Sequence, residues 1–467
     1  MVFSSASFLI FFLPCLLVLY FLVPRRCRYL RNLVLLAFSL AFYACGGPKF
    51  LLLMLLSIAI NYAGGLLAGP AHRPSTRRLG MTLAVVLGLA LLGWFKYAGF
   101  FGEMLHALLP VVPVPQVTLP IGISFFTFQG LSYVIDVYRG DAAVQRDPLK
   151  LALYIAFFPQ LVAGPIVRYT TVAEEIDERH ESVSEFSAGA VRFLFGLGKK
   201  MLLANAVARI ADAAFAAVMP SVLFAWLGAV AYTFQIYFDF SAYSDMAIGL
   251  GRMFGFHFLE NFNYPYVARS VTEFWRRWHI SLGSWFRDYV YIPLGGSRVG
   301  KARWVRNLVI VWGLTGLWHG AAWNFVAWGL YFAAFLLLEK LFLGRWLKRV
   351  PVLGHVYVLL AALFSFVLFD AASVPAALGT AGGLLGLGGL PLWDSGALYY
   401  LRSYAPVLAL AAVGSTPLPA ALCRRIAAGR AGRVLDALEP AALLALLAVC
   451  TAFLVSGSAN PFLYFRF

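Results

Sequence analysis

Apolar segments long enough to cross a membrane recur along most of this chain, with short polar or basic loops between them. A helix of about 20 apolar residues spans the hydrocarbon core of a bilayer. We place such segments at residues 5–23, 32–45, 49–69, 80–102, 117–137, 150–167, 187–218, 221–238, 307–338, 354–370, 402–420 and 439–457. The pattern predicts an all-α polytopic membrane protein with about 11 to 13 spanning or half-spanning helices.

Two of these segments are interrupted. Lys199 and Lys200 divide residues 187–218, which is compatible with two short helices. Residues 307–338 would measure roughly 48 Å as one helix, which is too long for a hydrocarbon core of about 30 Å. Three glycines offer a break in this segment, and they are Gly313, Gly316 and Gly320.

Residues 239–306 are the least lipid-like part of the chain. Ser270 and Glu273 have the spacing of a capping box, so a helix is expected to start there. If that helix continues, one face of it carries six large apolar residues, namely Trp275, Trp278, Leu282, Trp285, Phe286 and Tyr289. Arg276 and Arg287 lie away from that face. This arrangement predicts an amphipathic helix at a membrane interface.

Composition agrees with the hydropathy pattern, because 61% of the 467 residues are hydrophobic and 12% are charged. The net charge of +16 is explained by the excess of Lys and Arg that cytoplasmic loops carry, so binding to nucleic acid is not indicated. The basic loops are predicted to be cytoplasmic, and they are 24–31, 72–79, 139–150, 339–350 and 424–433. Residues 46–49, residues 103–116 and the N-terminus are then expected outside. The five cysteines are scattered and predict neither a metal site nor a disulfide framework.

His319 is the only Asp, Glu, Lys, Arg or His residue in the 32-residue run 307–338. Ionisable residues at membrane depth are costly and usually face a bundle interior or a wet cavity. The neighbouring small residues would let other backbones approach closely, and they are Gly316, Gly320, Ala321 and Ala322. A buried imidazole favours its neutral form, which can accept a proton from a hydroxyl group. His319 is therefore the best candidate for a functional residue.

Three other polar residues are weaker candidates, because each has a structural explanation. His279 lies at the edge of the apolar face of the predicted amphipathic helix. Asp239 follows an apolar segment directly, where a carboxylate can cap a helix or face water. Gln129 lies in the middle of an apolar segment, where it could line a cavity or mark a kink.

Six segments together resemble the membrane-bound O-acyltransferase family, in particular its bacterial branch typified by the alginate O-acetylation membrane protein. The resemblance extends to about residue 340, and its most specific segment is FWRRWHISLGSWFRDYVYIPLGGSR. The other five segments are PIGISFFTFQGLSYVIDVYRG, FFPQLVAGPIVRY, DFSAYSDMAIGLGRMFGF, NFNYPY and GLWHGAAWNFVAWGLYF.

The resemblance implies a bundle of tilted helices around a central funnel or tunnel, with interfacial and re-entrant helices. It implies one integral membrane domain over residues 1–467, with a motif-bearing core at about 115–340 and C-terminal spans at 354–457. His319 matches the family's catalytic histidine, and His279 matches its second polar residue. Oxyanion stabilisation would fall to His279, Trp318 or free backbone amides. Arg276, Arg277 and Arg287 would hold donor phosphates, although headgroup anchoring is an alternative for them. Asp239 and Gln129 complete the expected substrate-binding set.

The implied function is O-acetylation of an extracytoplasmic polysaccharide such as alginate. Acetyl groups would come from a cytoplasmic donor such as acetyl-CoA, with no tightly bound cofactor and no metal. A periplasmic SGNH-type acetyltransferase or a similar partner would complete transfer, and the protein would lie in a bacterial inner membrane with its N-terminus in the periplasm. Two alternatives stay open at this point: a transporter or flippase, and a lipid-directed acyltransferase of the same family. A non-catalytic scaffold is the weakest reading, because it leaves His319 unexplained.

Overall fold

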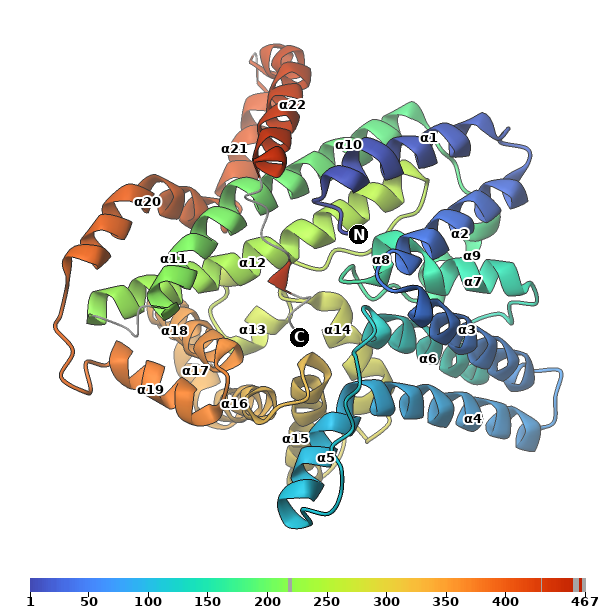
Figure 1. The fold of residues 1–467 in the computed structure, drawn as a ribbon, viewed down its shortest axis with the longest axis horizontal. Coiled ribbons are helices and arrows are strands. Elements are labelled where there is room, and N and C mark those ends of the chain that lie inside the picture. Colours follow the sequence, from blue (N-terminus) through green and yellow to red (C-terminus); the bar gives the residue numbers. More distant parts are fainter. Residues whose placement is uncertain (217–220, 430, 457–461, 464–467) are drawn as a thin grey trace. The chain divides into compact units, whose positions relative to one another are not determined.

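The computed structural model describes residues 1–216, 221–429, 431–456 and 462–463, and it contains helices but no strand within these ranges (Figure 1). Six helical stretches in the described chain are long and apolar enough to cross a membrane, and a pair bent by 72° would make a seventh. The six are Pro48–Ala68, Pro74–Leu108, Val222–Met253, Trp323–Leu347, Pro351–Asp370 and Gly432–Val455, and the bent pair is Ser395–Gly414 with Leu418–Ala427. The all-α polytopic fold is thus confirmed. The remaining expected segments form shorter or less apolar helices.

The chain divides into two compact units, one of residues 1–193 and 244–259 and the other of residues 194–243 and 260–467. The first, unit 1, contains α1 (Leu13–Leu22), α2 (Arg28–Ala44), α3 (Pro48–Ala68), α4 (Pro74–Leu92), α5 (Ala98–Leu108), α6 (Ile123–Arg139), α7 (Pro148–Ala156), α8 (Phe158–Leu161) and α9 (Tyr169–Asp177). In α3 and α4, glycines allow the helices to touch. A Cβ atom on Gly64 would lie 2.5 Å from that of Ala84, and one on Gly80 would lie 2.4 Å from that of Leu67.

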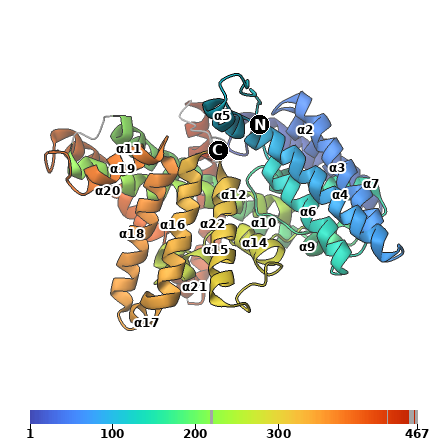
Figure 2. The same cartoon turned by 90° about the horizontal axis from the view of Figure 1, so that it is seen from below.

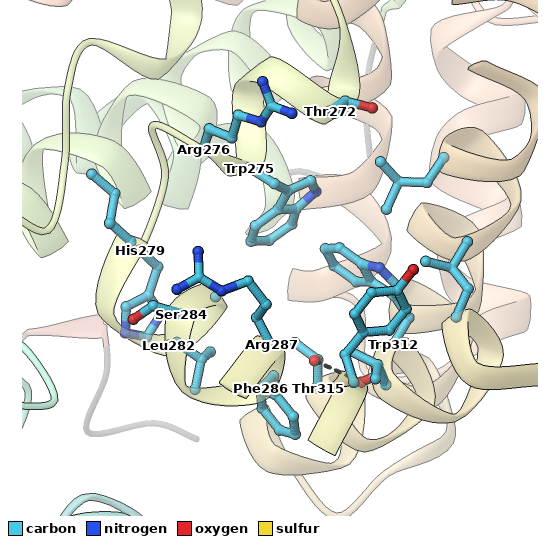
Figure 3. Close-up of a pocket in the computed structure, with 16 residues that line it drawn as sticks. Thr272, Trp275, Arg276, His279, Leu282, Ser284, Phe286, Arg287, Trp312 and Thr315 are labelled. Atoms are coloured by element: carbon cyan, nitrogen blue, oxygen red, sulfur yellow. Dashed lines mark hydrogen bonds between the residues drawn. The ribbon is translucent and has the colours of Figure 1, made fainter. Parts of the chain in front are cut away.

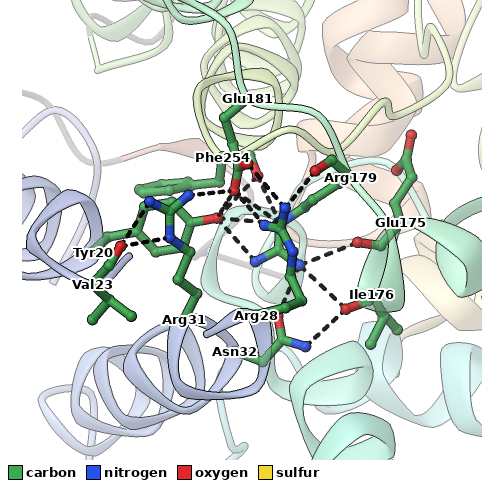
Figure 4. Close-up of polar contacts among 10 residues, drawn as sticks. All are labelled: Tyr20, Val23, Arg28, Arg31, Asn32, Glu175, Ile176, Arg179, Glu181 and Phe254. Carbon is green, nitrogen blue, oxygen red and sulfur yellow. Dashed lines mark hydrogen bonds and ion pairs between the residues drawn. The ribbon is translucent and has the colours of Figure 1, made fainter. Parts of the chain in front are cut away.

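Unit 1 also holds a buried cluster of charged side chains around Glu181, which we call the Glu181 cluster (Figure 4). Arg28 and Arg31 both donate hydrogen bonds to the Glu181 carboxylate. Arg179 Nε lies 3.8 Å from the same carboxylate and donates to the carbonyl oxygen of Phe254 at 2.9 Å. The cluster thereby ties the start of α2 to the segment after α9 and to the end of α12 (Val222–Met253).

The second unit, unit 2, contains α11 (Asn205–Ala216), α13 (Val271–Trp275), α14 (Ile280–Phe286), α15 (Lys301–His319), α16 (Trp323–Leu338), α17 (Gly344–Leu347), α18 (Pro351–Asp370), α19 (Val374–Leu384), α20 (Ser395–Gly414), α21 (Leu418–Ala427) and α22 (Gly432–Val455). Helices α15, α16 and α18 lie side by side (Figure 2). A core rich in aromatic and alanine side chains joins them to α13 and to the first part of α12. Helices α10 (Val183–Gly198) and α12 contribute residues to both units.

The break expected in residues 307–338 is confirmed, because α15 ends at His319 and α16 begins at Trp323. The interruption expected at Lys199 and Lys200 is wrong. Both lysines lie in a π-helical turn, Lys199–Ala204, that joins α10 to α11 without a gap. The helix tolerates Lys200 in a buried position because its ammonium group pairs with Asp239 at 2.5 Å.

Helix α12 is longer than the apolar segment at 221–238 predicted. It continues to Met253, so Asp239 lies inside the helix and not at its end. Polar side chains can continue a helix at this depth when they are satisfied inside the protein. Asp239 meets this condition, since its two carboxylate oxygens accept bonds from Lys200 and from the backbone N–H of Leu463.

Candidate functional site

The backbone turns sharply at His279. Helix α13 starts as the capping box predicted, with Ser270 Oγ accepting a hydrogen bond from the N–H of Glu273 at 3.0 Å. It ends at Trp275, and α14 begins at Ile280. His279 lies between them with φ 44°, in the left-handed region that a non-glycine residue seldom adopts. The prediction of one continuous helix is therefore wrong. A turn between α13 and α14, and not a helix face, determines the direction of the His279 side chain.

The apolar side chains of this region are mostly buried inside the protein. Four of the six predicted face residues are at most 6% exposed, and they are Trp278, Leu282, Trp285 and Phe286. Trp278 contacts Phe274 and Phe366 in the core of unit 2. The prediction of an aromatic face in the headgroup zone is wrong, because neighbouring helices and not lipid cover these rings.

His319 is held at the end of α15 by close packing against α16. A Cβ atom on Gly316 would lie 2.2 Å from the carbonyl oxygen of Phe325, and one on Gly329 would lie 2.1 Å from that of Trp312. A Cβ atom on Gly320 would meet the ring of Phe325 at 2.1 Å. These distances exclude any side chain at the three positions, so the glycines allow α15 and α16 to pack at short distance. The predicted close approach of another backbone is confirmed at Gly316, whereas Gly320 packs against the side chain of Phe325.

The two histidines meet in unit 2, although 40 residues separate them in the sequence. Their ring centroids are 6.4 Å apart, and the side chains are 1% exposed for His279 and 7% exposed for His319. Trp318 lies against both rings, at 5.7 Å from His279 and 5.0 Å from His319. Three further aromatic rings surround the pair: Phe240 at 4.7 Å from His279, and Trp328 and Phe369 at 4.9 Å and 5.4 Å from His319.

His279 is chemically unusual. Neither of its ring nitrogens has a hydrogen-bond partner within the described residues, although both are buried. A buried polar group in that state needs an explanation, such as a ligand or a catalytic role. Residue 279 lies outside the candidate membrane-spanning helices, and burial lowers the pKa of its imidazole to about 3. The ring is therefore neutral near pH 7, with one nitrogen able to accept a proton.

His279 lines a mainly apolar cavity of about 500 Å³ (Figure 3). Helices α13, α14 and α15 supply most of its wall, with Trp275, Trp312 and Thr315 among the lining residues. Cavities of this size and apolar character are typical of small-molecule sites. Arg276 and Arg287 also line the cavity and have exposed side chains.

A second cavity of about 600 Å³ shares Thr272 and Arg276 with the first. Its wall carries three further cationic side chains, namely Arg269, Lys340 and Lys348. Two carboxylates, Glu273 and Glu339, are present as well. The Glu339 carboxylate accepts hydrogen bonds from the first two N–H groups of α13. Within the described residues, no group of three or more His, Cys, Asp or Glu side chains could hold a metal ion.

Comparison with known proteins identifies the relatives of this chain. The model of the membrane-bound O-acyltransferase family matches residues 142–374. A relative from Azotobacter vinelandii named "Probable alginate O-acetylase AlgI" is 46% identical over 81% of this chain and 76% of its own length. A relative of the same name from Pseudomonas putida is 40% identical over the full length of both chains. This chain belongs to the membrane-bound O-acyltransferase family. A "Peptidoglycan O-acetyltransferase" from Helicobacter pylori is 33% identical over 84% of this chain and 81% of its own length.

Family membership and the candidate spans make this protein a multi-pass membrane O-acyltransferase. The transporter and scaffold readings of the sequence are thereby set aside. The two histidines and Trp318, which the sequence nominated for this chemistry, form one buried group in unit 2. Their roles in the transferase reaction stay predictions.

The other nominated residues of the acyltransferase are placed differently. Arg276 and Arg287 line the cavity, and Arg287 also pairs with Asp288 at 2.7 Å. Arg277 instead binds Glu273 and the carbonyl oxygen of Asn263. Gln129 is fully buried in unit 1, and both ends of its amide lack a hydrogen-bond partner in the described chain.

We expect Asp239→Asn to destabilise the acyltransferase and not to weaken substrate binding. The substitution would remove the carboxylate that pairs with the buried Lys200 ammonium group, and breaking a buried ion pair typically costs about 3–5 kcal/mol. Thermal unfolding in detergent measures the effect. The double variant Lys200→Met with Asp239→Leu is the control, and it should recover much of the loss. A raised KM at unchanged stability would instead support the predicted substrate contact.

Two residues near the histidines, Trp275 and Asn261, were not predicted as site residues from the sequence. Trp275 lines the cavity, and its buried indole N–H has no partner in the described chain. The predicted amphipathic helix instead places this ring at the membrane interface. Asn261 contacts the backbone beside His279, and its signal was the unusually polar segment NFNYPY.

Proposed function

We propose that this protein transfers acetyl groups from a thioester donor on the cytoplasmic side to hydroxyl groups of an extracytoplasmic polysaccharide. The observation that carries the proposal is His279, a buried imidazole with both nitrogens unbonded in the described chain, lining a cavity beside the family histidine His319. The names of the relatives support acetyl as the transferred group and alginate or peptidoglycan as the kind of acceptor.

The arrangement of the histidines suits acyl transfer. With ring centroids 6.4 Å apart, one reacting group could lie at hydrogen-bond distance, roughly 2.8 Å, from each ring. His319 would accept the proton of the acceptor hydroxyl as the oxygen attacks the thioester carbonyl. The C–S bond then breaks, the C–O bond forms, and the proton passes to the departing thiolate. His279 or the Trp275 indole would donate a hydrogen bond to the oxyanion. Transient acylation of His319 is the alternative route.

The two cavities suit a donor such as acetyl-CoA, which carries phosphates at one end and a thioester at the other. Arg269, Lys340 and Lys348 would hold phosphates in the second cavity, and Arg276 and Arg287 would hold phosphates at the first. The apolar part of the first cavity would lead the thioester to His279. Lys340 and Lys348 belong to the basic segment 339–350 that the positive-inside rule assigns to the cytoplasm. This assignment would let the donor enter from that side.

The acceptor would approach from the opposite side. A periplasmic SGNH-type acetyltransferase or a similar partner would carry the group from this protein to the polymer in a bacterial inner membrane. The choice of acceptor among alginate, peptidoglycan and other polysaccharides would then depend on that partner.

The donor can be tested with purified protein in lipid nanodiscs. We expect cleavage of acetyl-CoA in the presence of an acceptor, and little cleavage of palmitoyl-CoA. Preference for palmitoyl-CoA would support the lipid-directed alternative. Absence of cleavage with either thioester would contradict the proposed donor class.

Arg287→Gln and Arg276→Gln should each raise the KM for acetyl-CoA by about tenfold. Each would lose one charge-assisted hydrogen bond to a phosphate, and a loss of about 1.4 kcal/mol corresponds to that factor. Initial rates at varied donor concentration give KM and kcat separately. Arg298→Gln is the matched control, because Arg298 is exposed and outside this cavity. An unchanged KM for acetyl-CoA in both cavity variants would contradict donor binding by these arginines and would favour the alternative that they bind lipid headgroups.

A further inference from the structure

We propose that Asn261 is a positioning residue for His279, which holds the imidazole in the cavity by capping α14 in its place. The proposal rests on the function proposed above, because it assumes that His279 serves the transfer reaction. Asn261 is fully buried in unit 2 and belongs to the segment NFNYPY.

The first part of the argument concerns the backbone on either side of His279. The N–H of Ile280 donates to the carbonyl oxygen of Asn261 at 3.0 Å. Before the turn, the N–H of Asn263 donates to the carbonyl oxygen of Arg277 at 2.9 Å. These two bonds pair residues 261–263 antiparallel to residues 277–280. The pairing closes a short loop with His279 at its bend, where the backbone has φ 44°.

The second part concerns the start of α14. The first N–H groups of a helix need acceptors, and the N-cap side chain normally supplies one. His279 is the N-cap residue of α14, but its imidazole makes no such bond in the described chain. Asn261 Oδ1 accepts instead, from the N–H of Ser281 at 3.2 Å and from its hydroxyl group at 2.9 Å. The imidazole is therefore not needed to cap α14, and it can face the cavity.

Because the Asn261 amide caps α14 in place of the His279 imidazole, removing the amide should affect the imidazole. Without Oδ1, the N–H and the hydroxyl group of Ser281 both lose the acceptor that the structure shows for them, and a nitrogen of the neighbouring His279 ring could then take over the N-cap position. The left-handed backbone at His279 is also unfavourable and persists only while its surroundings enforce it. Rotation of the ring toward the helix or relaxation of the backbone would each remove the imidazole from the reacting group.

The test compares three variants with the wild-type protein in acetyl-CoA turnover. Asn261→Ala should lower kcat by at least tenfold and change the KM for acetyl-CoA less than twofold, because the phosphate-binding cations do not move. Asn261→Asp retains an acceptor oxygen and should recover most of kcat. Asn263→Ala is the matched control, since this side chain is exposed and the bonds that the structure gives Asn263 run through its backbone. A wild-type kcat in Asn261→Ala would overturn the proposal.

A double variant separates positioning from general destabilisation. If Asn261 acts through His279, adding Asn261→Ala to His279→Ala should cause no further loss of kcat. An equal loss in both backgrounds would show that Asn261 only stabilises the fold. The histidine 13C NMR signal that disappears in His279→Ala gives a readout without turnover. Asn261→Ala should shift this signal and Asn263→Ala should not, and an unshifted signal contradicts positioning. Wild-type turnover by His279→Ala would instead refute the role of His279 in the proposed reaction, and absence of turnover by the wild-type protein would refute the proposed function.

Discussion

Replacing His319 with Ala is expected to leave a folded, membrane-inserted protein whose acetyl transfer is about a thousandfold slower. A general base that accepts the proton of the attacking hydroxyl contributes about 10²–10⁴ to a rate. His319 is 7% exposed and its ring is surrounded by Trp318, Trp328 and Phe369, and none of these three side chains can serve as the base in its place. Purified protein in nanodiscs, supplied with acetyl-CoA and a hydroxyl acceptor, gives the rate directly.

His279→Ala should also slow transfer strongly, because its ring lines the cavity and lies against the same reacting space. His72→Ala is the control for both variants, since His72 is an exposed histidine. All three variants should elute and melt like the wild type. Transfer at the wild-type rate by His319→Ala would contradict the assignment of the base. The same result for His279→Ala would leave its unbonded nitrogens without a role in the reaction.

The sequence predicted the parts of this site that depend on local pattern. His319 stood out because a lone ionisable side chain in an apolar run is costly in a membrane. The break after it was predicted from length together with the glycines at 313, 316 and 320, and the glycines matter because α12 has the same length of 32 residues and is unbroken. Gly316 was predicted to allow close packing, and its neighbour Phe325 leaves no room for a Cβ atom.

The sequence could not predict the parts that depend on distant residues. The helix between residues 270 and 290 breaks because residues 261–263 pair with its middle, and helical periodicity contains no sign of that pairing. The sequence places Trp278 at the membrane interface, because an apolar helix face has the same sequence pattern whether lipid or protein covers it. Nothing local to Asp239 indicates that Lys200 is its partner, and the substrate contact of Asp239 stays a prediction.

Glu181→Gln is expected to lower the stability of unit 1 by about 3–5 kcal/mol, the usual loss when one partner of a buried ion pair is removed. In the Glu181 cluster, the single carboxylate serves Arg28 and Arg31, and their side chains are 20% and 3% exposed. A neutral amide would leave these guanidinium groups buried without a counter-charge. Since typical domains are stable by only about 5–15 kcal/mol, little properly folded protein should be recovered from the membrane.

The pH dependence of stability gives an independent check on the Glu181 cluster. Burial alone would raise the pKa of Glu181, but hydrogen bonds from Arg28 and Tyr20 outweigh it and lower the pKa to about 2. Because the folded pKa is below the unfolded value, the stabilisation is present above pH of about 4.5 and is lost as the pH falls toward 2. The wild-type melting temperature should therefore fall as the pH decreases from about 4.5 toward 2. The melting temperature of Glu181→Gln should not show the part of this decrease that comes from protonation of Glu181.

Two variants decide whether the effect belongs to the charge. Glu178→Gln changes an exposed carboxylate three residues away and should melt like the wild type. Adding Arg28→Met to Glu181→Gln removes one of the unpaired cations and should restore part of the stability. Equal melting temperatures for Glu181→Gln and the wild type would show that the arginines reach water or lipid phosphate instead. No residue of the Glu181 cluster belongs to the unit that holds the histidines. Any folded Glu181→Gln protein should therefore turn over acetyl-CoA with the wild-type kcat, which separates stabilisation from catalysis.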